Sequence, residues 1–172
     1  AYATRFTTYS NRNDNFLASS AITGDELILG IGMTITLNGK TGGANYYLTN
    51  IRLGDGAQVV IDASAGPVNV FLTGRLSSGS GADIQVIGNP TDFSLFSNSN
   101  TPIDINNLGS FRGFIYAPYA KIELANHLTL YGAVWGREIE MKNSVDFYYD
   151  TALQEKFLSN ELILVSWRDV RS

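Results

Sequence analysis

The sequence predicts an all-β fold, a short right-handed parallel β-helix (β-solenoid), on three observations. Short segments alternate apolar and polar residues, glycine and small polar residues separate these segments, and one segment recurs along the chain. We expect a single domain with a lead-in or cap at residues 1–22, stacked coils at 23–150 and a C-terminal helix-plus-strand cap at 151–172.

The lead-in is polar and contains the run from Ser10 to Asn15. Such residues favour turns, because their side chains bond to nearby backbone groups. We therefore predict an irregular segment, with one short helix around Asn15 to Ser20.

Alternation with period two begins after Gly24, and it places one face of each segment in a core and the other in water. Gly, Asn, Ser and Asp separate the segments and supply turns. No helical stretch is long enough to connect parallel strands of an α/β sheet. The clearest strands are Met33–Leu37, Gln58–Asp62, Asp83–Ile87, Ile103–Ile105, Lys121–Leu124 and Glu138–Met141.

Self-similarity favours stacked coils over a sandwich or a barrel. The segment from Gly113 to Leu124 recurs from Gly132 to Met141, two residues shorter at its corner. Val145 to Tyr149 opens a third layer, and Val70–Leu72 and Leu95–Phe96 fall where earlier copies belong. A period of roughly 17 to 25 residues fits one coil of a β-helix, and a sandwich ranks second.

The C-terminal segment has a different pattern. Thr151 to Leu158 combines a capping threonine with good helix formers, and Leu162 to Trp167 is an apolar strand. Because a solenoid needs its open ends covered, we predict that this tail, the lead-in, or both act as caps.

Composition restricts the partners. The net charge is −4 and the basic residues are scattered, so we expect no nucleic acid. The chain has no cysteine, and no apolar run approaches the roughly 18 residues that span a bilayer, so no direct membrane insertion is expected. The start at Ala1 favours a processed or truncated chain whose export signal or anchor was removed.

No residue is predicted to be catalytic, to bind a cofactor or to ligate a metal. His127 is the only histidine, and we interpret it as a polar side chain in the Asn126-His127 turn. The stretch Ser78 to Gly81 lacks the apolar strand that precedes a hydrolase nucleophile. Asp14 and the Gly54-Asp55-Gly56 loop leave a calcium site open as a weaker alternative to turn chemistry.

Two further groups have both a structural and a functional interpretation. Glu123 and Glu140 occupy equivalent places in successive coils, where Lys121, Arg137 and Lys142 relieve their repulsion. A paired-carboxylate glycosidase is the alternative. The aromatic residues fit a core ladder first and an external sugar- or protein-binding strip second; they include Tyr46, Tyr47, Tyr116, Tyr119, Tyr131, Trp135, Tyr148 and Tyr149. Of each consecutive tyrosine pair, one member is expected outside.

The stretches Phe114 to Ala120, Leu130 to Gly136 and Phe147 to Asp150 also carry a family resemblance. They resemble the β-solenoid domain of exported, PilX-like, type IV pilus-associated bacterial surface proteins, which end in a segment similar to Ser166 to Val170. The resemblance spans residues 68 to 170.

The resemblance implies a non-catalytic structural or adhesive module outside the cell or on its surface. Its partners would be other subunits of a surface or pilus assembly, or an extracellular ligand. It implies no cofactor and no enzyme activity. Two alternatives stay open: a polysaccharide-binding or polysaccharide-cleaving β-helix, and a self-polymerising solenoid.

Overall fold

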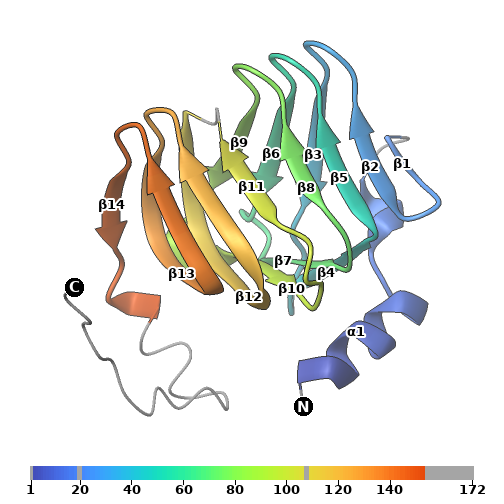
Figure 1. Cartoon of the computed structure of the whole chain (residues 1–172). Helices are drawn as coiled ribbons and strands as arrows, with labels where there is room; N and C mark the ends of the chain where they lie inside the picture. Colours follow the sequence, from blue (N-terminus) through green and yellow to red (C-terminus); the bar gives the residue numbers. More distant parts are fainter. Residues whose placement is uncertain (1, 19–20, 107–108, 154–172) are drawn as a thin grey trace.

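The computed structural model describes residues 2–18, 21–106 and 109–153, and most of this part is β-structure (Figure 1). The helices are α1 (Tyr2–Asn11) and the 3-10 turns η1 (Asn15–Leu17) and η2 (Pro90–Asp92). The strands are β1 (Ile22–Thr23), β2 (Glu26–Leu29), β3 (Thr34–Asn38), β4 (Ala44–Leu48), β5 (Asn50–Leu53), β6 (Gln58–Asp62), β7 (Val68–Leu72), β8 (Leu76–Ser78), β9 (Asp83–Ile87), β10 (Phe93–Ser97), β11 (Ile103–Asn106), β12 (Ser110–Ala125), β13 (Thr129–Lys142) and β14 (Asp146–Tyr149).

The strands form two sheets. One has 11 strands, including β2-β5-β8-β11 on one arm and β4-β7-β10 on the other, and the second is β3-β6-β9. The two arms meet in β12, because its first half pairs with β10 and its second half with β11. Every pair is parallel except β1 with β2 in the described residues. The predicted all-β class is confirmed, and Figure 1 shows β2, β5, β8 and β11 side by side, followed by β12, β13 and β14.

The spacing between paired residues shortens along the chain. Ala44 pairs with Val68 and Val68 with Phe93, steps of 24 and 25 residues, whereas Thr129 pairs with Asp146, a step of 17. The three-strand sheet ends at β9. Later in the chain, tight turns such as Asn126-His127 stand where the earlier layers have a strand of this sheet. Both turn residues adopt positive φ angles, 64° and 65°.

The predicted repeat is confirmed residue by residue. Gly113 pairs with Gly132, and Ile122 pairs with Ile139. The register shifts between Ala117 and Lys121, where the second copy is two residues shorter. β14 forms the predicted third layer, with Phe147 beside Leu130. The earlier copies also align, since Leu95 and Phe96 pair with Val70 and Phe71.

Inward-pointing side chains stack into apolar ladders between the sheets. One ladder crosses six layers and is buried in all but the last; it consists of Leu27, Ile51, Leu76, Ile103, Ile122 and Ile139. Each fully buried aliphatic side chain of this kind stabilises the fold by about 1.5–3 kcal/mol relative to exposure. The ladders therefore both hold adjacent layers together and set their register.

The lead-in is more regular than the sequence predicts, because residues 2–11 form α1 and the expected helix around Asn15 is only the 3-10 turn η1. Tyrosine and threonine are weak helix formers, so the prediction of an irregular segment followed local propensity. Tertiary packing overrides it: Phe6 is buried in a cluster with Phe71, Phe96, Phe114 and Leu153 on the outer side of the sheet.

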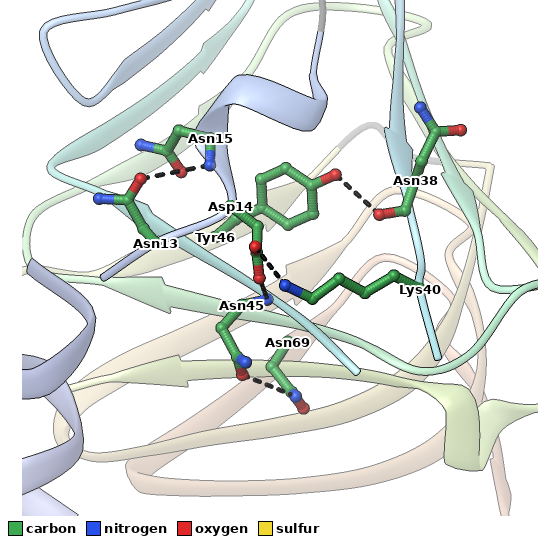
Figure 2. A network of polar contacts seen from close by, with 8 residues as sticks. All are labelled: Asn13, Asp14, Asn15, Asn38, Lys40, Asn45, Tyr46 and Asn69. Atoms are coloured by element: carbon green, nitrogen blue, oxygen red, sulfur yellow. Dashed lines mark hydrogen bonds and ion pairs between the residues drawn. The ribbon is translucent and has the colours of Figure 1, made fainter. Parts of the chain in front are cut away.

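Asp14 and Asn15 occupy the place of a further strand beside β4, the first strand of its arm (Figure 2). Asp14 donates its backbone N–H to the Asn45 carbonyl, and its carboxylate accepts the Asn45 N–H, both at 2.8 Å. The Asn15 side-chain amide accepts the Tyr47 N–H and donates to the Tyr47 carbonyl. The lead-in thus supplies hydrogen-bond partners to backbone groups at this edge of β4.

At the other end, Thr151 lies in a turn and Ala152 and Leu153 are helical. The rest of the predicted helix to Leu158 lies outside the described residues, as does the predicted strand from Leu162 to Trp167.

Candidate functional site

The last three strands present an aromatic surface, which we define as Arg112, Tyr119, Tyr131, Trp135 and Tyr148. Strand alternation turns the side chains of Arg112, Tyr131, Trp135 and Tyr148 away from the core, and the register aligns them in rows. Tyr119 is exposed in the stretch between Ala117 and Lys121, where the register shifts. Arg112, Tyr131 and Tyr148 form one row across β12, β13 and β14. Tyr116 and Trp135 form a second row across β12 and β13.

The first row is a flat stack. The Arg112 guanidinium carbon lies 4.7 Å from the centre of the Tyr131 ring, close enough for a cation–π interaction. The Tyr131 and Tyr148 rings are 5.0 Å apart and inclined by only 13°. The three side chains therefore form a column in which Arg112 and Tyr148 lie against the Tyr131 ring, with the charged guanidinium at one end and the Tyr148 ring at the other.

The second row joins the surface to helix α1. The Trp135 and Tyr116 rings are 6.1 Å apart, and Tyr116 also contacts Tyr2 of α1 edge-on at 4.9 Å. The Tyr2 hydroxyl donates to the Ser97 carbonyl at 2.6 Å. Burial, and then the nearby Tyr119, raise the pKa of Tyr116. Tyr119 and Trp135 are exposed beside this half-buried contact.

The predicted stacking of Glu123 on Glu140 is confirmed by the register. Lys121 bridges them, with its Nζ atom 3.2 Å from a Glu123 oxygen and 2.6 Å from a Glu140 oxygen. Hydrogen bonds from Lys121 and Lys142 lower the pKa of Glu140. A glycosidase needs one carboxyl whose pKa is raised so that it can donate a proton. This arrangement does the opposite, so it favours the ion-pair interpretation.

The other residues considered for a catalytic or metal-binding role form hydrogen bonds within the turns and strands of the fold. His127 is exposed at the corner and donates its backbone N–H to the Asn143 carbonyl at 3.0 Å. The Asp55 carboxylate accepts the Ser80 N–H at 2.9 Å, as turn chemistry predicts. Ser78 donates its hydroxyl to the Asn106 carbonyl at 2.5 Å. In the described ranges, no three His, Asp or Glu side chains gather as a metal site.

The tyrosine pairs divide in two ways. Tyr46 is buried and donates its hydroxyl to the Asn38 carbonyl at 2.8 Å, while Tyr47 packs on the outer cluster, as expected. Tyr148 and Tyr149 are both exposed, because no described layer covers β14.

The sequence analysis did not single out Arg112. The repeat aligns Arg112, which directly precedes Gly113, with Tyr131, which directly precedes Gly132, so the pairing of these two residues was predictable.

Residues 49–156, more than half of the chain, match the model of a family described as a domain of unknown function, DUF7305. Comparisons with curated proteins and with solved structures give no significant match. No helix in the described part of the chain has the length and apolarity required to cross a membrane.

Proposed function

This chain belongs to the DUF7305 family of domains of unknown function, and we propose that it is a non-catalytic structural or adhesive module of a bacterial surface or type IV pilus-like assembly. It acts outside the cell or on its surface and makes protein–protein or surface contacts. The aromatic surface is the contact region.

The composition of the aromatic surface carries this proposal. Tyrosine, tryptophan and arginine dominate the binding energy of protein interfaces, and all five residues of the surface are of these types. Tyr119, Trp135 and Tyr148 are exposed although each carries a large apolar ring. Stacked parallel strands hold the rings at fixed spacing, which reduces the entropy lost on binding.

We further infer that the layers form a short right-handed parallel β-helix. The support is the parallel pairing of layers that follow one another in the chain, together with the strong preference of parallel crossover connections for the right hand. An experimental structure with left-handed coils would contradict this inference.

The location and the contact region are tested together in bacteria that carry the gene. Extracellular protease is added to intact cells, and digestion of the protein without lysis is expected. A photo-crosslinking amino acid replaces Trp135, or, as a control, the exposed Gln85 of β9 on the other sheet. We expect crosslinks to one defined surface protein from position 135 and none from 85. Protection in intact cells, or equal crosslinking from both positions, refutes the proposal.

Polysaccharide binding is the second candidate, because the exposed Tyr148 ring at the end of the stack can offer its outer face to a sugar ring. A glycan array tests it, with Tyr148→Ala as the variant that removes the outer ring. Binding that disappears in this variant supports the candidate. Silence of the wild-type protein on the array, together with no release of reducing sugar, eliminates both the binding and the cleaving forms.

A further inference from the structure

The outer face of the larger sheet carries one aromatic side chain in each of five consecutive layers. The register aligns them in a single row, which we call the aromatic column; it consists of Tyr47, Phe71, Phe96, Tyr116 and Trp135. Phe71 and Phe96 are buried, whereas Trp135 is 45% exposed. Because neighbouring layers are about 4.8 Å apart, the column offers a regular series of apolar contacts along the stack.

Helix α1 covers the middle of this column. The Tyr2 ring lies 4.9 Å from Tyr116 in β12. The Phe6 and Tyr9 rings lie 5.3 and 4.5 Å from Phe71 in β7, two layers or about 9.6 Å before β12. The rise from Tyr2 to Tyr9 along a helix is about 10.5 Å, so α1 lies along the stack and its rings match the layer spacing. Anchors at i, i+4 and i+7 are the pattern by which an amphipathic helix binds a groove.

The column holds α1 in its helical conformation. The helix has only 10 residues, whereas an isolated helix of fewer than about 12–15 residues is marginal in water. Most of its residues are tyrosine, threonine, serine or asparagine, which are weak helix formers. A helix that carries the same rings on a better helix-forming sequence is therefore expected to bind the column more tightly.

The column also continues past the start of α1. Trp135 lies one layer beyond Tyr116, the residue that Tyr2 contacts. One further helical turn adds about 5.4 Å, which matches one further layer of about 4.8 Å. A helix that begins one turn earlier than α1 would thus cover Trp135, which already belongs to the aromatic surface.

We propose that the aromatic column is a groove for an amphipathic helix of a partner protein, which replaces α1 and extends to Trp135. The partner helix carries a large apolar side chain at each of the three α1 anchor positions and one more a turn earlier. Tethered α1 competes at an effective concentration in the millimolar range. The partner outweighs this advantage through its helix propensity and its contact with Trp135. The inference rests on the proposed contact function and names the kind of partner.

Two fluorescently labelled synthetic peptides test the groove by fluorescence anisotropy. The short peptide has the sequence of residues 2–13, and the long peptide adds Phe-Ala-Glu-Ala before Tyr2, which places a ring one turn earlier. The full-length Phe6→Ala variant provides the vacated groove, because Phe6 is the buried anchor of α1. We expect both peptides to bind this variant about tenfold or more tightly than they bind the wild type. A short peptide that itself carries Phe6→Ala is the matched control and should not bind.

Trypsin cleavage after Arg5 shows whether α1 is released, and Tyr2→Ala is added to the variant if it is not. Circular dichroism shows that each variant is folded. If neither peptide binds a folded variant with a released α1, the groove is refuted.

Trp135→Ala on the Phe6→Ala background locates the end of the groove. The long peptide should bind the Phe6→Ala variant roughly fivefold more tightly than the short one, and Trp135→Ala should abolish this difference. Tyr149→Ala, which removes an exposed ring outside the column, is the control and should preserve it. Equal affinities of the two peptides, or a difference that survives Trp135→Ala, overturn the extension to Trp135. Crosslinking from position 135 in cells together with silent peptides would refute the helical partner and leave the proposed contact function standing.

Discussion

Gly132 lies so close to Gly113 in the next layer that a Cβ atom on Gly132 would be 1.9 Å from the Gly113 carbonyl oxygen. Both residues adopt positive φ angles, 146° at Gly113 and 148° at Gly132. Glycine is therefore required at position 132 twice, for its backbone conformation and for the contact between layers.

Gly132→Ala is expected to lower the free energy of unfolding by more than about 3 kcal/mol, because conformational strain and a backbone clash add together. Urea denaturation followed by circular dichroism measures the loss. Gly42→Ala is the matched control: its φ is also positive, at 84°, but no atom lies within 4 Å of the added Cβ. Strain alone should cost about 1–2 kcal/mol there. If both variants lost the same free energy of unfolding, the close contact between Gly132 and Gly113 would add nothing to the cost of the substitution.

The glycine pair also shows why much of the fold is predictable. The repeat of Gly113 at Gly132 and of Ile122 at Ile139 is written in the sequence, and stacking converts that repeat directly into register. Helix α1 was not predictable in the same way. Most of its residues are weak helix formers, and long-range contacts explain it, such as that of Phe6 with the ring of Phe71, 5.3 Å away and 65 positions later.

The same distinction applies to the functional surface. Strand alternation assigned an outside position to one tyrosine of each pair, but it gave no information about what covers that position. Tyr47 is covered by the outer cluster, whereas Tyr148 is exposed. Which outward rings are free depends on where α1 packs, and that long-range contact leaves no periodic signal in the sequence.

Asp14→Ala tests the closure of the first layer. The carboxylate of Asp14 is buried, accepts the Asn45 N–H and pairs with Lys40 at 2.5 Å. Its removal leaves a backbone donor without a partner, so we expect a loss of about 2 kcal/mol or more in urea denaturation.

Asp14→Asn serves as the control for that loss. Its amide oxygen still accepts the Asn45 N–H, while the charge that attracts Lys40 is gone. We expect a stability between those of the wild-type protein and the alanine variant. If Asp14→Ala is as stable as the wild type, the lead-in does not close the edge.

Alkaline pH should destabilise the protein through Tyr46. Burial, and more weakly the Asp14 charge, raise the pKa of Tyr46 from 10.0 to about 12 despite the opposing hydrogen bond to Asn38. Between these values the unfolded chain releases a proton that the folded chain retains, so stability falls as pH rises. Its contribution is complete below pH 10 and lost as the pH passes about 12.

Urea midpoints measured from pH 9 to 12 follow this effect. Tyr46→Phe removes the ionisable group, so its midpoint should fall less steeply across the same range. Burial also raises the pKa of Tyr2, so part of the slope is expected to remain. An unchanged slope in Tyr46→Phe would show that Tyr46 ionises equally easily in the folded and unfolded chains.

Replacing a buried aromatic residue with alanine should destabilise the protein more than replacing an exposed one. Phe6 is 4% exposed and contacts Phe71, so Phe6→Ala should weaken the packing of α1 by about 3 kcal/mol. Trypsin reports this locally, because Arg5 and Arg12 lie in α1 and directly after it. Cleavage there should become faster in Phe6→Ala.

Trp135→Ala removes a larger but half-exposed ring from the aromatic surface, and we expect a smaller loss of stability with unchanged cleavage of α1. Faster cleavage in both variants would mean that Trp135 helps to hold the helix and is not a free contact residue.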